Sequence, residues 1–207
     1  EEFLDFCTGA KGIKMLYDFC VKAILNPEIH PERMEELISL LLGKKVKLLK
    51  VLPNDNTRIS DETSLLVMDF LVQLEDGSVA NVEIQKIGYA FPGQRSACYS
   101  ADLLLRQYLQ VRGQMPKKSF SYRKISNVYT IVLFEKSPSE FHQFPEQYLH
   151  KFQQESDTGL KMNLLQEFVF VALDIFKKNH QNRTIRKRLE GWLSFLSSDK
   201  PEDIIAL

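Results

Sequence analysis

The sequence predicts an α/β fold in which helices flank both faces of a mixed central sheet. Three observations predict it: two helical apolar patterns come first, three strand-like segments follow one another, and strands then alternate with helices. Consecutive strands joined by short turns pair antiparallel, whereas strands separated by helices can pair in parallel. A sheet built from both arrangements is mixed, and helices cover its two faces.

The first part of the chain is expected to contain two helices and three strands. Apolar residues recur at helical spacing in both helical segments, Pro31 opens the second, and Gly43 closes it. The segment 75–78, Glu-Asp-Gly-Ser, joins the last two strands as a hairpin. The expected helices are residues 12–25 and 31–43, and the expected strands are residues 45–52, 65–74 and 79–86.

The remainder is expected to alternate between helices and strands: helix 94–112, strand 128–134, helix 141–154, strand 167–173 and helix 183–196. The first of these helices is expected to turn five residues inward, which are Ala97, Ala101, Leu104, Leu105 and Tyr108. We expect residues 1–135 to form the core domain. Residues 136–207 are expected to form a C-terminal extension of helices and a strand packed on it.

Composition limits the class of protein. Of the 207 residues, 44% are hydrophobic and 26% are charged, which excludes a disordered chain. No apolar stretch approaches the roughly 18 residues of a membrane-spanning helix. The formal net charge is zero, so a surface that binds nucleic acid must be local. Three cysteines without a CxxC spacing and an acidic start fit a reducing, cytoplasmic location.

One acidic residue lies inside an apolar segment. Asp69 follows Leu-Leu-Val-Met and precedes Phe-Leu-Val, where a carboxylate is costly unless it is paired or binds a cation. The two-residue period of the next strand places Asn81, Glu83 and Gln85 on one face. Asp69 therefore either pairs with a neighbouring Arg or Lys or shares a cation site with that face.

The length of the hairpin loop decides which residue lies opposite Asp69. A two-residue loop places Ile84 there, whereas a three-residue loop with Gly77 left-handed places Glu83 there. Two opposed carboxylates, with Cβ atoms about 5 Å apart, repel each other unless a divalent cation joins them. Such oxygen ligands suit Mg²⁺. If the pair is functional, we predict the three-residue loop or an equivalent bulge.

The chain has Asp69 before a hairpin, Glu83-Ile84-Gln85 after it, and Arg95 and Tyr99 on the helix that follows. This pattern resembles the PD-(D/E)XK nuclease superfamily. More narrowly, the chain resembles the Rpn-type recombination-promoting nuclease and transposase family from about residue 24 onward. The resemblance implies a restriction-endonuclease-like core. It also implies a Mg²⁺-dependent hydrolase, with Mn²⁺ as a substitute, that cuts DNA in recombination or in mobile elements.

The resemblance also assigns roles to individual residues. Asp69 and Glu83 correspond to the metal-binding acids, and the Ile84 carbonyl corresponds to the usual backbone ligand. Gln85 stands where most of the superfamily has Lys, so it can orient a water or a phosphate oxygen but carries no charge. Arg95 and Tyr99 match the Arg-Tyr positions of the family, and Arg95 would hold a phosphate near the metal. Alternatively, Arg95 pairs with Asp69 or Glu83 and only supports the site.

Two local basic clusters are candidates for binding DNA phosphates, or are simply solvated surfaces. The first comprises Lys117, Lys118, Arg123 and Lys124, and the second comprises Arg183, Arg186, Lys187 and Arg188. Three functions stay open: a metal-dependent DNA endonuclease, a DNA-binding module with weak or no cleavage, and a structural remnant of a mobile element. A homodimer would supply two active sites for cutting both strands of a duplex.

Overall fold

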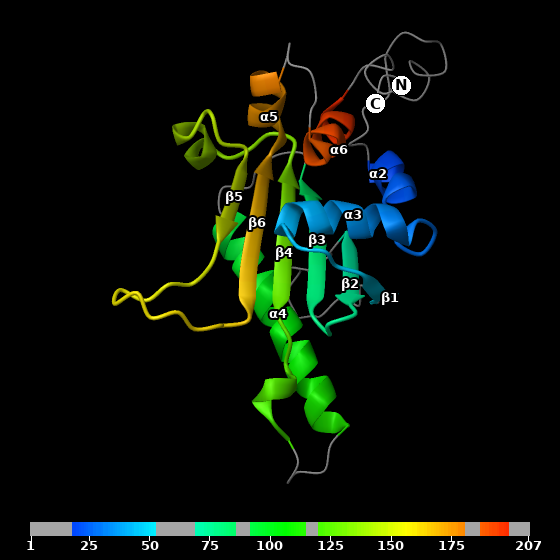
Figure 1. Cartoon of the computed structure of the whole chain (residues 1–207), viewed down its shortest axis with the longest axis vertical. Coiled ribbons are helices and arrows are strands. Elements are labelled where there is room, and N and C mark those ends of the chain that lie inside the picture. The colour runs from blue at the N-terminus through cyan, green and yellow to red at the C-terminus, as the bar shows by residue number, and fades with distance from the viewer. Residues whose placement is uncertain (1–17, 53–68, 86–91, 115–119, 181–186, 199–207) are drawn as a thin grey trace, which may run out of the picture.

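The computed structural model describes residues 18–52, 69–85, 92–114, 120–180 and 187–198 (Figure 1). A single six-stranded sheet has the order β1-β2-β3-β4-β6-β5. The pairs β1–β2, β2–β3 and β5–β6 are antiparallel, and β3–β4 and β4–β6 are parallel, which confirms the mixed α/β sheet. The strands are β1 Leu48–Val51, β2 Phe70–Leu74, β3 Val79–Gln85, β4 Val128–Phe134, β5 Leu149–Phe152 and β6 Gln166–Ala172.

Helices cover the two faces of this sheet. Figure 1 shows α3 and α6 in front of the strands and α4 behind them, with the C-terminal half of α4 extending beyond the sheet. A short helix, α5, continues directly from β6. The helices are α2 Asp18–Ile24, α3 Pro31–Leu42, α4 Pro92–Gly113, α5 Leu173–His180 and α6 Arg188–Ser197. Two short 3₁₀ helices, η1 Tyr122–Lys124 and η2 Ser139–Gln143, complete the described elements.

The largest hydrophobic cluster lies on the α3 face. Four residues of α3 at helical spacing, Met34, Leu37, Ile38 and Leu41, are fully buried there. They pack in one cluster with apolar residues of β2, β3, β4 and β6. Each such side chain contributes about 1.5–3 kcal/mol through burial. This face therefore anchors the strands whose other face carries the polar residues described below.

Most of the predicted elements are present. The α3 helix ends at Gly43, which adopts the left-handed conformation (φ 74°) expected of a C-terminal glycine. The strand predicted at 128–134 coincides with β4, and that predicted at 167–173 lies within one residue of β6. Strands β5 and β6, from the region expected to form an extension, belong to the same sheet as the rest.

The helix predicted at residues 141–154 is wrong. A 3₁₀ turn, η2, occupies its start, and β5 occupies its end. Pro145 between them cannot donate a backbone hydrogen bond to a continuing helix. Residues 149–152 instead pair antiparallel with β6, with Phe152 opposite Phe168, because the edge of the sheet offers unpaired backbone groups. The helix α5 was not predicted.

The inward face of α4 also differs from the prediction. The residues buried against the sheet are Ser96, Tyr99, Ser100, Asp102 and Leu103. Ala97 and Ala101 are exposed, and Leu105 has 61% of its surface accessible. The polar stripe of this helix faces the sheet because the strands opposite it also carry polar side chains, among them Asn81, Glu83 and Thr130. The buried face of α4 therefore mixes polar residues with the apolar Tyr99 and Leu103, unlike that of an ordinary amphipathic helix.

Candidate active site

The β2–β3 hairpin has the register that brings the two acids together. Leu71 pairs with Asn81 and Phe70 with Val82, and the next step of this register places Asp69 opposite Glu83. The loop contains three residues, since the N–H of Leu74 donates to the carbonyl of Ser78 at 2.8 Å. Gly77 adopts φ 85°, the left-handed conformation predicted for this loop. The prediction of a three-residue loop is therefore confirmed.

Asp69 directly precedes the first residue of β2 and is half-buried. Its Oδ2 accepts a hydrogen bond from the Ile84 N–H at 2.8 Å. Because the N–H and C=O of one residue point to the same side of a strand, the Ile84 carbonyl also points toward the β2 side. The neighbouring Gln85 carbonyl accepts from the Glu135 N–H at 2.8 Å, on the opposite side, as this alternation requires.

Glu83 is a buried carboxylate, with 4% of its surface accessible. Its Oε1 accepts from Gln85 Nε2 at 3.0 Å and lies 3.4 Å from Arg95 Nη2. Burial raises the pKa of Glu83 above its ordinary value of 4.5, and the Asp69 carboxylate raises it too, while Gln85 and Arg95 act in the opposite direction. The Gln85 hydrogen bond and the Arg95 charge therefore compensate only part of the cost of burying this group.

Arg95 enters the site from the first turns of α4. Its guanidinium lies 5.0 Å from the ring centroid of the fully buried Tyr99, one helical turn further on. This stacking and the contact with Glu83 hold the guanidinium beside the carboxylate. The alternative in which Arg95 pairs with an acid of the site describes the observed geometry. The same position also suits a cation that meets a phosphate, since a third of its side chain is accessible.

Buried polar atoms without a protein hydrogen bond collect on this face. Within the described part of the chain, Glu83 Oε2, Gln85 Oε1 and both polar atoms of the Asn81 side chain have no such partner. Thr130 Oγ1, opposite Asn81 on the neighbouring strand β4, also has no protein hydrogen bond. Buried polar groups are normally hydrogen-bonded, so several orphaned oxygens on one face indicate groups that meet a ligand.

The donor set fits a divalent cation. It offers two opposed carboxylates, Asp69 and Glu83, a backbone carbonyl at Ile84 and an unpartnered Glu83 oxygen, and hard cations prefer such oxygen ligands. Across residues 18–52, 69–85, 92–114, 120–180 and 187–198, no group of three or more His, Cys, Asp or Glu side chains is placed to hold a metal. A cation here would therefore keep several waters, as Mg²⁺ commonly does.

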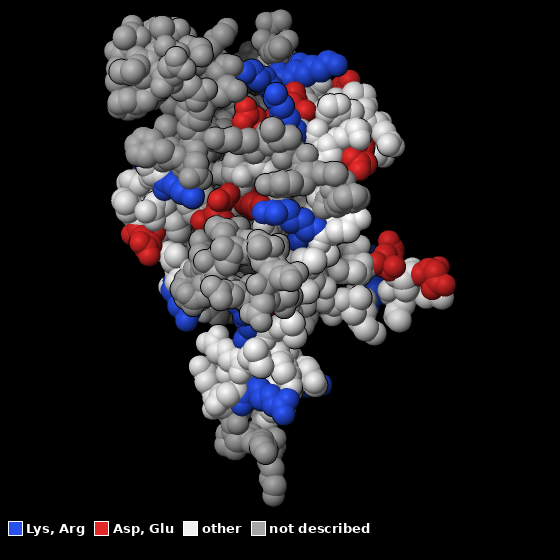
Figure 2. Space-filling model, turned by 180° about the vertical axis from the view of Figure 1, so that it is seen from behind, with Lys and Arg blue, Asp and Glu red and all other residues white. Residues whose placement is uncertain are grey.

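The basic clusters lie on different parts of the molecule. Arg123 and Lys124 are exposed on η1, which joins the C-terminal half of α4 through stacked Tyr108 and Tyr122 rings 6.1 Å apart. Lys187 and Arg188 begin α6 on the other face of the sheet. In Figure 2, basic and acidic side chains lie together near the middle of the α4 face, and basic side chains recur toward its narrow end. The remaining predicted members, Lys117, Lys118, Arg183 and Arg186, lie outside the described residues.

Several other acids have protein partners and lie outside the candidate site. Glu35 Oε1 accepts the Leu48 N–H at 2.9 Å, and Glu36 binds both Trp192 Nε1 at 2.9 Å and Arg188 Nη2 at 3.2 Å. Both lie on α3, across the sheet from Glu83. Asp102, on α4, forms an ion pair with Arg106 at 2.8 Å, and its side chain is buried. Asp61 and Glu62 lie outside the described residues.

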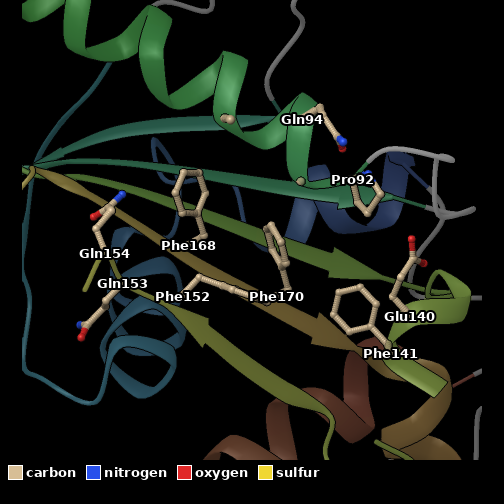
Figure 3. A pocket seen from close by; sticks show the side chains of 11 residues that line it. Pro92, Gln94, Glu140, Phe141, Phe152, Gln153, Gln154, Phe168 and Phe170 are labelled. Carbon is tan, nitrogen blue, oxygen red and sulfur yellow. The ribbon is translucent and has the colours of Figure 1, made fainter. Parts of the chain in front are cut away.

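Sequence reasoning missed an aromatic cavity beside this site. It contains Phe152, Phe168 and Phe170, whose rings line a space next to the start of α4 (Figure 3). The helix prediction for residues 141–154 concealed it, because a helix would not place Phe152 opposite Phe168. The signal that could have found it is the alternation of Phe168 and Phe170, which puts both rings on one face of a strand.

The described residues thus form a mixed sheet with an acid pair on a hairpin and a basic residue on the next helix. A family model described as PD-(D/E)XK nuclease family transposase matches residues 15–206. The chain belongs to this family, which supports a nuclease-like function. No curated protein and no solved structure matches the chain. None of the helices in the described part of the chain has the length and apolarity needed to span a bilayer.

Proposed function

We propose that the chain is a Mg²⁺-dependent endonuclease that hydrolyses DNA phosphodiester bonds, of the Rpn type, acting in the cytoplasm in recombination or in mobile elements. The observation that carries the proposal is the opposition of Asp69 and Glu83 across the three-residue hairpin. A divalent cation bound between the two carboxylates would relieve their repulsion while leaving both ionised. Hydrolysis of a DNA phosphodiester is a reaction that such a cation promotes, because it activates water and offsets the charge of the phosphate.

The roles of the residues follow from their positions. Asp69, Glu83 and the Ile84 carbonyl would hold the metal, which supplies an activated water and offsets charge on the scissile phosphate. Gln85 presents an unpartnered Oε1 to the same space and orients a water or a phosphate oxygen. Arg95 leaves Glu83 to bind a phosphate oxygen, and Tyr99 holds its guanidinium in place.

The basic clusters would bind the phosphate backbone away from the cut. Arg123 and Lys124 on η1 would extend the DNA path along α4 from the site. Lys117 and Lys118, which lie outside the described residues, are proposed as members of the same cluster. Lys187 and Arg188 of the second cluster lie across the sheet, so one copy of the chain would reach two separate DNA segments. Arg183 and Arg186, the other proposed members of this cluster, lie outside the described residues. A homodimer places two sites on one duplex. Each phosphate contact should contribute about one unit to the slope of log affinity against log salt.

A plasmid-nicking assay with Mg²⁺, Mn²⁺ or EDTA tests the proposal on the wild-type chain, Asp69→Ala and Glu83→Ala. Metal-dependent nicking should fall by at least about a hundredfold in both variants, because losing a ligand forfeits several kcal/mol of transition-state stabilisation. Asp157→Ala, which removes an exposed acid in the β5–β6 connection, is the matched control and should cut normally.

Metal binding provides a readout independent of cleavage. Mg²⁺ or Ca²⁺ should raise the melting temperature of the wild-type chain and of Asp157→Ala but not that of Asp69→Ala. Absence of cutting by the wild-type chain, with DNA binding that still weakens steeply with salt, would replace the endonuclease by a DNA-binding module. Absence of both would leave the structural remnant of a mobile element.

A further inference from the structure

A cavity of about 720 Å³ opens beside the candidate active site, on the same face of the sheet. Its floor is formed by Phe168 and Phe170 of β6 and by Phe152 of β5, with the start of α4 on the opposite side (Figure 3). The rings of Phe152 and Phe170 have centroids 5.2 Å apart. Phe152 keeps 49% of its surface accessible, so the aromatic wall is open to a ligand. The volume falls in the range of roughly 300–1,000 Å³ typical of small-ligand pockets.

The polar groups of the cavity are neutral amides and one acid. Gln94, Gln153 and Gln154 line it together with Glu140, and its lining contains no Lys, Arg or His. Gln153 Nε2 donates to Glu167 at 3.2 Å, whereas the described residues provide no hydrogen bond to the side chains of Gln94 and Gln154. Such a lining repels a phosphate. It suits a flat, uncharged ring with hydrogen-bonding edges, since amide side chains pair with base edges and aromatic rings stack on base faces.

The cavity is joined to the active site in two ways. Gln94 and Arg95 are consecutive on α4, and the first lines the cavity while the second contacts Glu83. In the sheet, Glu83 pairs with Val132, and Val132 pairs with Phe170, so the acid and the ring occupy one row on one face. With strands about 4.8 Å apart, that row places Phe170 about 10 Å from Glu83.

We propose that this cavity binds an unpaired nucleobase of the DNA strand whose phosphate lies at the active site. The inference rests on the proposed function and adds the substrate class to it: single-stranded, frayed or base-flipped DNA. A base inside a duplex presents no open face, so it must leave the helix to stack on Phe152. The cavity therefore selects DNA that is already unpaired, or that distorts at little cost, over regular duplex.

The test compares binding of two oligonucleotides in EDTA, where no metal-dependent cleavage interferes. One is an oligothymidylate about 12 nucleotides long, and the other is an abasic chain of the same length and charge. The wild-type chain should bind the oligothymidylate about five- to 100-fold more tightly, because a base stacked on an aromatic ring adds that much affinity. Phe152→Ala should bring this ratio toward one, and Gln154→Ala should lower it in part, without changing the affinity for the abasic chain.

Two further variants separate the cavity from other aromatic surfaces. Phe144→Ala removes a phenylalanine with 57% of its surface accessible that does not line the cavity, and it should keep the wild-type ratio. Tyr122→Ala removes the exposed ring of η1. A ratio lost in Tyr122→Ala but kept in Phe152→Ala would overturn the proposal, since the bases would then stack at η1. A wild-type ratio near one, or no binding of either oligonucleotide, would overturn it as well.

The plasmid assay distinguishes this inference from the proposed function. If the wild-type chain nicks DNA with metal but binds both oligonucleotides equally, the nuclease function is supported and the base pocket is not. The cavity would then suit a peptide or an apolar ligand. If the preference for oligothymidylate over the abasic chain depends on Phe152 but the wild-type chain never cuts DNA, the base pocket is supported and the nuclease function is not.

Discussion

The two faces of the sheet treat polar groups in opposite ways. On the α3 face, the polar side chains that approach the core have partners: Glu35 accepts the Leu48 N–H, and Ser39 Oγ accepts the Val46 N–H at 3.0 Å. On the α4 face, Asn81, Glu83 and Thr130 are buried, and each has at least one polar atom without a protein hydrogen bond. An unsatisfied buried polar group costs about 1–3 kcal/mol.

This difference suggests that one face of the sheet mainly stabilises the fold and that the other carries the candidate site. The α3 face carries the largest apolar cluster and the satisfied polar groups, so it supplies most of the packing energy. The α4 face retains groups that an optimised core would replace by apolar residues. Local violations of packing rules that persist in a folded chain are expected at functional sites. The comparison itself therefore indicates the same face as the acid pair does.

The largest expected effect is loss of packing on the α3 face. Leu37→Ala removes a fully buried side chain and should lower the free energy of unfolding by about 2–5 kcal/mol. Leu105→Ala, on the outer surface of α4, should change it by less than about 0.5 kcal/mol. Urea denaturation followed by circular dichroism measures both. Equal losses in the two variants would contradict the assignment of the buried face of α4.

The Glu83→Gln variant should be more stable than the wild-type chain at neutral pH when no metal is present. Burial raises the pKa of Glu83, so the folded chain holds this proton more tightly than the unfolded chain does. The ionised carboxylate is therefore destabilising above that raised pKa, and the neutral amide should recover about 1–3 kcal/mol. Thermal unfolding in EDTA measures the gain, while nicking activity should be lost.

The pH dependence of that gain has a defined sign. As the pH falls from the raised pKa of Glu83 toward its ordinary value of 4.5, the wild-type carboxyl becomes protonated in the folded chain. The advantage of Glu83→Gln should therefore shrink on acidification. An advantage that grows toward low pH would show that the carboxylate is stabilised by its neighbours rather than penalised by burial.

Much of the site was accessible to sequence reasoning because it depends on local rules. The two-residue period of a strand predicts Glu83 and Gln85 on one face. Of the two loops that the sequence allows, the three-residue loop with Gly77 left-handed is the one that places Asp69 opposite Glu83, and the structure has it. Both rules involve residues close in sequence. The apolar runs of β4 and β6 were recognisable for the same reason.

The features that sequence reasoning missed depend on what packs against each element. Leu149 to Phe152 is a strand only because β6 offers it an edge, which no local pattern reveals. The inner face of α4 mixes polar residues with Tyr99 and Leu103, so the usual assumption that leucines point inward placed Leu105 wrongly. The aromatic cavity follows from both of these long-range facts, and it was missed with them.

Thr130→Val should stabilise the chain, by about 1 kcal/mol. Thr130 is fully buried on the α4 face, and its hydroxyl has no protein hydrogen bond, so an isosteric apolar side chain removes a desolvation cost. The matched variant on the other face, Ser39→Ala, removes a hydroxyl that accepts the Val46 N–H and should destabilise by a similar amount. Chemical denaturation of both variants measures the contrast, and changes of the same sign would remove the distinction between the faces.

The smallest expected effect is that of Glu36→Gln, which should lower the unfolding free energy by less than about 1 kcal/mol at neutral pH. Glu36 pairs with Arg188, whose side chain is 75% accessible, and ion pairs open to solvent contribute little. The hydrogen bond from Arg188 lowers the pKa of Glu36 below 4.5, although partial burial opposes the shift. A lowered folded pKa contributes stability that is present above the ordinary pKa and lost as the pH falls through the lowered one.

The two glutamate variants should therefore respond to acid in opposite ways. Acidification should remove the disadvantage of Glu36→Gln and the advantage of Glu83→Gln, so both curves converge on the wild-type curve from opposite sides. Thermal unfolding of the three chains in EDTA at a series of pH values measures this convergence. Curves that approach the wild type from the same side would mean that the Glu83 carboxylate is compensated as fully as that of Glu36. The stability measurements would then give no sign that Glu83 is a destabilising buried charge on the α4 face.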